Sequence, residues 1–335
     1  MRKKIICIFL VICFTFSLCS CDTSNNEKDS DKIKILCTLF PQYDWIRNIT
    51  AGVDNVEVSL IIANGTDPHS YQPTAADIMN ISNCDMLVYV GGDSDTWVKK
   101  AIERSKNQSI NTVALTELDG ITLHDISSGS HTHEDDGEGE HEEHSHEGHS
   151  HSALDEHLYL SLENACTAVK RLATKICDLD PENSDIYLRN ASEYALKLTN
   201  LSQSLKESVE QIPEHDRFIL FADRFPFVYL LSDYGIHYSA AFEGCTTDVD
   251  ADFDTIIRLI HEADEHNVNY IVVTESSDAS LANTVISSTK TKDQKILTFN
   301  SMQAISKTQI ENGVTYLSIM QENVNQVKIA LNIKN

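Results

Sequence analysis

The chain has 335 residues, with 26 Lys and Arg against 51 Asp and Glu, so its formal net charge at pH 7 is −25. That length is enough for two domains of ordinary size, and 41% hydrophobic residues can supply a core for each. The acidic excess argues against binding of nucleic acid, because a phosphate-binding surface needs clustered Lys and Arg.

The N-terminal residues predict a secretory signal. A basic start, Met1-Arg2-Lys3-Lys4, precedes an apolar run that ends at Leu18 and is shorter than the ~20 residues of a membrane-spanning helix. Leu18-Cys19-Ser20-Cys21 resembles a bacterial lipobox, so we expect residues 1–20 to be removed and Cys21 to be lipidated. Residues 21–32 are polar and predict a tether. These features together predict an extracytoplasmic protein anchored by lipid to the bacterial cell membrane.

Short apolar segments that alternate with amphipathic ones predict an α/β fold with parallel sheets and flanking helices. The first half contains candidate strands at residues 33–37, 56–62 and 86–90, and the second half at 218–221, 237–241, 270–274 and 296–299. Amphipathic patterns predict helices at residues 44–50, 75–82 and 253–266.

His69 is the first candidate metal ligand. It lies in Asp67-Pro68-His69-Ser70-Tyr71-Gln72-Pro73-Thr74, which follows the second predicted strand. Two prolines stiffen this segment, so His69 is expected on a rigid turn at the carboxyl end of a strand, where ligands of open α/β sheets collect. Taken alone, the motif favours a surface histidine on a proline-rich turn over a metal ligand.

Residues 131–151 read HTHEDDGEGEHEEHSHEGHSH and contain no apolar side chain. Imidazole is a common ligand of borderline metals, and the neighbouring carboxylates raise the local cation concentration. We favour auxiliary metal capture over a solvated insertion with incidental affinity. The candidate residues are His131, His133, His141, His144, His146, His149 and His151.

Residues 180–212 predict one long helix, with Pro181 near its start and Pro213 after its end. Such a helix in an α/β chain indicates a connection between two lobes, at residues 33–179 and 213–335. An ordinary long surface helix would show the same apolar stripe, and periodicity does not separate the two interpretations.

Three segments resemble the zinc and manganese solute-binding lipoproteins of bacterial ABC transporters. They are residues 38–45 (TLFPQYDW), residues 67–74 (DPHSYQPT), and Gly91-Gly92 with Trp97, followed by the His-rich loop that zinc members carry. The resemblance implies two lobes, each a parallel sheet with flanking helices, joined by one rigid helix. It also implies a metal in the cleft with two ligands from each lobe, and it assigns the second ligand to His157.

The second lobe departs from the family pattern. Arg224 stands where zinc members place a third histidine, and Asn300 stands where the final acidic ligand is expected. A guanidinium cannot ligate a cation because it stays protonated. Asp223 and Glu275 are therefore the substitute candidates, with Arg224 expected to pair with one of them. A weak Asn300 ligand, or a clamp of arginine and carboxylate that only shapes the lobe, stays open as an alternative.

The function implied is capture of Zn²⁺ and its delivery to an ABC permease with its ATPase, by a monomer that is not an enzyme. Nitrogen ligands favour Zn²⁺ over Mn²⁺, although a manganese receptor of the same family and a surface protein for metal buffering or adhesion remain alternatives. The sequence has no HExxH motif for a zinc hydrolase and no GxxxxGK[ST] loop, so ATP chemistry must lie in another protein.

Overall fold

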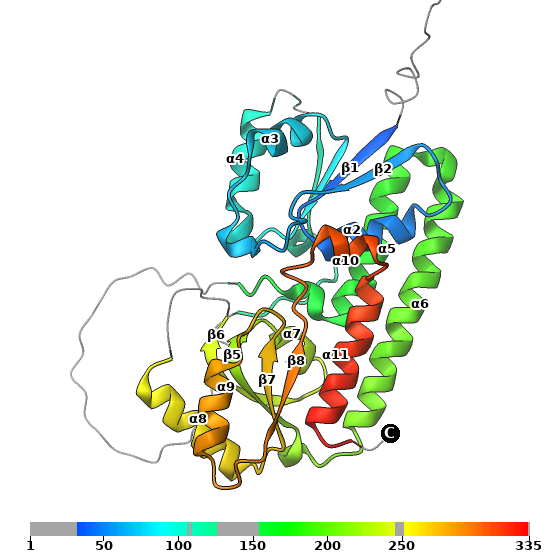
Figure 1. Ribbon diagram of the computed structural model, residues 1–335. Helices are drawn as coiled ribbons and strands as arrows, with labels where there is room; N and C mark the ends of the chain where they lie inside the picture. Colours follow the sequence, from blue (N-terminus) through cyan, green and yellow to red (C-terminus); the bar gives the residue numbers. More distant parts are fainter. Residues whose placement is uncertain (1–31, 106, 108, 126–153, 245–250, 334–335) are drawn as a thin grey trace, which may run out of the picture.

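The structure is a computed structural model that describes residues 32–125 (apart from 106 and 108), 154–244 and 251–333. These residues form two four-stranded parallel sheets, one in each lobe, with helices packed around them (Figure 1). The α/β fold with two lobes is thereby confirmed. The first sheet has the order β2-β1-β3-β4, with β1 Ile33–Cys37, β2 Val56–Leu60, β3 Met86–Tyr89 and β4 Asn111–Ala114. The second has the order β6-β5-β7-β8, with β5 Phe218–Phe225, β6 His237–Glu243, β7 Tyr270–Thr274 and β8 Lys295–Phe299.

All seven predicted strands are present, and β4 is the one that the sequence pattern missed. Its first two residues, Asn111 and Thr112, are exposed, and only Val113 and Ala114 are buried. As an edge strand it pairs with β3 alone, so it needs no long apolar run.

The helices cover both faces of the sheets. Their bounds are α2 Phe40–Ile49, α3 Ala75–Ser82, α4 Thr96–Arg104, α5 Leu162–Leu179, α6 Ser184–Val209, α7 Val228–Ser232, α8 Phe253–Glu265, α9 Ser280–Ser288, α10 Lys307–Glu311 and α11 Tyr316–Ala330. The start predicted for α2 was four residues late. Pro41 lies in the first turn of α2. Backbone N–H groups in a first turn have no hydrogen-bond partner within the helix, so a proline, which lacks this group, is tolerated there.

The long helix expected between the lobes is α6. A 3₁₀ turn, η6 (Pro181–Asn183), precedes it, and α5 packs along it. In Figure 1, α6 runs past both sheets at one edge of the molecule. Its buried stripe contacts the core through Tyr187, Ala191, Tyr194, Ala195, Leu198, Leu205 and Val209.

One hydrophobic cluster extends through both lobes. It joins Ile35 of the first sheet to Leu198 of α6 and Phe221 of the second sheet. At its centre, Asp44 Oδ2 accepts hydrogen bonds from the Tyr194 hydroxyl (3.2 Å) and the Tyr316 backbone N–H (3.1 Å). Burial raises the pKa of Asp44 in spite of these bonds. This carboxyl group therefore ties α2, α6 and α11 together inside the core.

Several sequence predictions fall outside the described residues. Cys21 and the seven histidines of residues 131–151 lie there, so their roles stay predictions, as do the domain boundaries. Within the described residues, the structure contains no helix that is both long enough and apolar enough to cross a membrane.

Candidate metal centre

His69 lies on a short turn of the first lobe, η1 (Pro68–Ser70). The carboxylate of Asp67 caps this turn, because its Oδ1 accepts a hydrogen bond from His69 N (3.0 Å). Pro68 is buried and fixes its own φ at the first position of the turn. The backbone of His69 is thus held in place, while the residue itself is exposed.

His157 lies immediately before the 3₁₀ turn η5 (Leu158–Leu160) and is only 3% exposed. Asp155 Oδ1 accepts hydrogen bonds from His157 N (2.8 Å) and from the ring Nδ1 (3.0 Å). A carboxylate at Nδ1 fixes the ring proton there and makes Nε2 an acceptor, as in many metal-ligating histidines.

The structure brings the two imidazoles together, with their ring centroids 5.5 Å apart and the ring planes at 50°. Gln303 of the second lobe lies between them, with its Nε2 3.0 Å from His69 Nε2 and 2.8 Å from His157 Nε2. An amide NH₂ group has two hydrogens to donate and no lone pair, so both ring nitrogens act as acceptors. The lone pairs of both histidines therefore point at one position, which is what a shared cation requires.

The cavity around this position is small and lined by both lobes. The space that the centre of a water molecule can reach inside it is about 10 Å³. This is close to the smallest volume that can hold one water molecule. The lining residues are Leu39, Pro68, His69, Val90, Ser94, Glu156, His157, Tyr159 and Gln303. A cavity of this size suits a single ion and excludes a larger organic ligand.

Glu156 supplies the carboxylate of this cavity. Its Oε1 accepts a hydrogen bond from Ser94 N (2.8 Å), and its Oε2 accepts one from the Ser94 hydroxyl. Gly92 allows this approach, because a Cβ there would lie 2.3 Å from Glu156 Cγ. Gly92 of the motif thus leaves room for Glu156 beside the histidines, whereas a Cβ at Gly91 would collide with Thr116 Oγ1.

The same loop is held by a buried carboxyl group. Asp95 Oδ2 accepts hydrogen bonds from Val90 N (2.6 Å) and Gly91 N (3.1 Å). Burial raises the pKa of Asp95 to about 6, with a smaller contribution from the nearby charge of Glu156. Its role in the structure is to fix the loop.

Asp223 and Glu275, the predicted ligands of the second lobe, are engaged elsewhere. Asp223 Oδ2 accepts hydrogen bonds from the backbone N (2.9 Å) and Oγ1 (2.7 Å) of Thr274. Glu275 accepts hydrogen bonds from the backbone N (2.8 Å) and Oγ (2.7 Å) of Ser301. Neither is among the described residues that line the cavity, so their role as ligands stays a prediction that the geometry does not favour.

Asn300 also has a structural partner, because its Oδ1 accepts a hydrogen bond from Met302 N (2.8 Å). This bond stabilises the turn that carries Gln303. Sequence reasoning stopped at Asn300 and missed Gln303, three residues further along the same loop. The signal available was a polar side chain just beyond the last strand of the second sheet, since ligands gather at such strand ends.

Arg224 pairs with neither Asp223 nor Glu275, contrary to expectation. Its Nη1 donates to Asp67 Oδ2 (3.0 Å) across the cleft, and its Nη2 lies 3.4 Å from Ser276 Oγ. The expected pair of arginine and carboxylate exists, but it joins the two lobes. Both side chains are about one quarter exposed.

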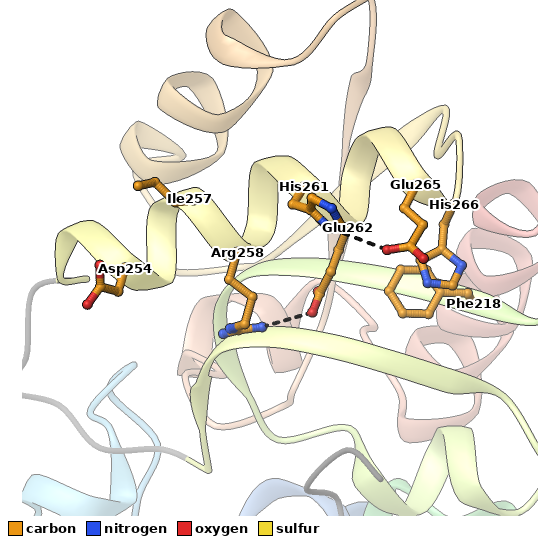
Figure 2. Close-up of a pocket in the computed structure, with 8 residues that line it drawn as sticks. All are labelled: Phe218, Asp254, Ile257, Arg258, His261, Glu262, Glu265 and His266. Atoms are coloured by element: carbon orange, nitrogen blue, oxygen red, sulfur yellow. Dashed lines mark hydrogen bonds and ion pairs between the residues drawn. The ribbon is translucent and has the colours of Figure 1, made fainter. Parts of the chain in front are cut away.

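A larger cavity of about 460 Å³ lies on the outer face of α8, away from the histidine pair (Figure 2). Figure 2 shows two ion pairs along the helix, Arg258 with Glu262 (3.5 Å) and His261 with Glu265 (3.3 Å). His266 stacks on Phe218 with ring centroids 3.8 Å apart. Across the described part of the chain, no group of three or more His, Cys, Asp or Glu side chains could hold a metal. The histidine pair with Gln303 is therefore the best candidate site.

The fold and this candidate site are typical of one class, solute-binding proteins with two lobes, and here two imidazoles line a small cavity at the junction of the lobes. A model of the family "Zinc-uptake complex component A periplasmic" matches residues 35–330, so the chain belongs to that family, whose members are substrate-binding receptors.

Individual relatives agree with this assignment. The chain is 30% identical to the high-affinity zinc uptake system protein ZnuA of Bacillus subtilis. The alignment spans 338 residues and covers the full length of both proteins. It is 27% identical to the manganese ABC transporter substrate-binding lipoprotein PsaA of Streptococcus pneumoniae, with 98% of each chain covered. The crystal structure of the metal-dependent lipoprotein YcdH from Bacillus subtilis matches with a TM-score of 0.71 and 26% identity, and the match covers 89% of this chain and 99% of that one.

Proposed function

We propose that this protein is the extracytoplasmic receptor that captures Zn²⁺ and delivers it to an ABC permease, whose ATPase supplies the energy. The observation that carries the proposal is the convergence of His69 Nε2 and His157 Nε2 on the single amide of Gln303. Two imidazole nitrogens held on structured turns favour Zn²⁺, while the manganese relative keeps Mn²⁺ as the second candidate.

We infer that His69 and His157 are the nitrogen ligands and that Gln303 contributes Oε1 as a third. The amide NH₂ of Gln303 faces the imidazoles, so the amide must rotate to present its oxygen to an ion. Oxygen and amide nitrogen exchange places in such a rotation without any movement of the backbone. Glu156 faces the same cavity and supplies negative charge near the cation.

The remaining parts of the proposal concern the membrane side of the protein. Cys21 carries the lipid that anchors a monomer to the outer face of the cell membrane. The histidines of residues 131–151 collect several ions weakly and raise the supply to the tight site. Asp223 and Glu275 are the remaining candidates for ligands from the second lobe.

The test is a titration of the purified protein with Zn²⁺ in competition with a chelator. Wild type should bind one ion tightly, and His69→Ala and His157→Ala should each lower that affinity about 100-fold or more, as expected for loss of a ligand. His215→Ala is the matched control, because that side chain is 80% exposed and pairs only with its neighbour Asp216. Tight binding that survives both ligand substitutions would reject the site.

A further inference from the structure

The pair of Arg224 and Asp67 connects the second lobe to the turn that carries His69. Asp67 uses both carboxylate oxygens: Oδ2 accepts from Arg224 Nη1 (3.0 Å), and Oδ1 accepts from His69 N (3.0 Å). One carboxylate thus joins a guanidinium of one lobe directly to the backbone of a candidate ligand in the other.

The strand β5 is built to aim Arg224 at the cleft. The pairing of β5 with β6 is regular up to Phe221 and resumes, shifted, at Arg224. Such an irregularity re-aims the side chain next to it, and it is common beside functional sites. Asp223 fixes the bulged backbone, because Oδ1 accepts from Arg224 N (2.8 Å) while Oδ2 holds Thr274. Asp223, a predicted ligand, thus also fixes the backbone that carries Arg224.

Resting on the proposed function, we propose that Arg224 is a positioning residue that holds the His69 turn in its binding geometry through Asp67. His69 is exposed, and its turn is only three residues long. A turn that is already fixed loses less conformational freedom when the ion binds, and the affinity rises accordingly.

The positive charge of Arg224 also repels the incoming cation, which lowers the affinity and so opposes the positioning effect. The two effects predict opposite signs, so one substitution separates them. Arg224→Met removes the guanidinium and keeps the unbranched stem. Positioning predicts that this variant binds Zn²⁺ about tenfold more weakly, which corresponds to about 1.4 kcal/mol. Repulsion predicts tighter binding.

The partner substitution is Asp67→Asn, which keeps an oxygen to cap His69 N and removes only the negative charge. Because the two residues act through each other, the double variant should bind Zn²⁺ no more weakly than the weaker single variant. Losses that add, or an Arg224→Met variant with unchanged or higher affinity, would overturn the proposal. The visible absorption of bound Co²⁺ provides a second readout, and Arg224→Met should change it because the His69 imidazole moves.

Lys307→Met is the matched control. Like Arg224→Met, this substitution removes one positive charge near the junction of the lobes. The ammonium group of Lys307, however, pairs with Glu311 (3.9 Å) inside α10. We expect this variant to keep the wild-type Zn²⁺ affinity and Co²⁺ spectrum. A wild-type protein that binds no single ion tightly would reject the proposed function. Tight wild-type binding that Arg224→Met leaves intact would reject only this inference.

Discussion

The Gln303 amide lies within hydrogen-bond distance of both imidazoles, where a third ligand of a shared cation would lie. Its amide hydrogens satisfy both ring nitrogens at 3.0 and 2.8 Å, and the Ser301 hydroxyl lies 3.2 Å from its Oε1. Ser301 in turn is bound by Glu275. This single side chain therefore connects both imidazoles of the first lobe to the Ser301 turn of the second.

Gln303→Glu should bind Zn²⁺ about tenfold more tightly than wild type, the scale of one charge-assisted contact. A carboxylate is a stronger ligand than an amide oxygen, and it has no hydrogens with which to hold the imidazoles in the metal-free state. The measurement is chelator competition, with Gln321→Glu as a control that adds the same charge at an exposed position of α11. Weaker binding by Gln303→Glu would exclude Gln303 from the ligand set.

The contrast between His69 and Gln303 shows how far single residues could be predicted. His69 lies in a motif stiffened by prolines, and His157 follows from a family resemblance, so a sequence motif and that resemblance together nominated both. Gln303 has no local pattern. It reaches the histidines, 234 and 146 positions away in the chain, only because the two lobes pack against each other. The cross-lobe pair of Arg224 and Asp67 was missed for the same reason.

At the scale of elements, Asp233 joins α7 to the start of α5. It is the C-cap residue of α7, and its Oδ2 accepts a hydrogen bond from the hydroxyl of Ser161, the N-cap of α5 (2.6 Å). Burial, opposed by the Ser161 hydrogen bond and helped by the nearby charge of Glu163, raises the pKa of Asp233 to about 6. Asp233 therefore binds its proton more tightly in the folded protein than in the unfolded chain.

This pKa predicts how stability depends on pH. Between an unfolded pKa near 3.8 and a folded pKa of about 6, the folded state binds more protons. The contribution of Asp233 to the free energy of unfolding is therefore complete below about pH 4 and is lost as the pH rises to about 6. Asp233→Asn stays neutral, so relative to wild type it should gain about 1–3 kcal/mol over that window.

Urea unfolding of both proteins at pH 4 and pH 6.5 measures this difference. Asp95 has a similar pKa but is present in both proteins, so its contribution cancels. The same difference in stability at both pH values would contradict the raised pKa of Asp233.

The helices and strands with a strong apolar periodicity were the ones that the sequence predicted correctly. The bounds of α3 and β1 agree with the sequence prediction, because each combines a clear apolar period with turn residues at its ends. The edge strand β4 and the first turn of α2 were missed, since tertiary pairing and a tolerated proline decide them.

The whole molecule is held together by more than the long helix. The hydrophobic cluster continues from the first sheet through α6 into the second. The Tyr229 hydroxyl of the second lobe binds Asp155 O (2.8 Å), and Lys307 N binds Ala63 O (2.7 Å) of the first. A hinge motion would have to break these contacts as well as bend α6.

We therefore expect the overall shape to change little when Zn²⁺ binds. Small-angle X-ray scattering of the metal-free and the saturated protein should give the same radius of gyration within experimental error. A clear decrease on saturation would indicate closure of the lobes and would contradict the continuous core as the determinant of rigidity.

A rigid receptor of this kind has a consequence for transport kinetics. The receptor without an ion and the receptor with one have the same shape, so both present the same docking surface to the permease. Receptors without an ion therefore act as competitive inhibitors of those that carry one. On the proposed function, the rate of uptake follows the fraction of receptors that carry an ion, and overproduction of the receptor in scarce zinc slows import.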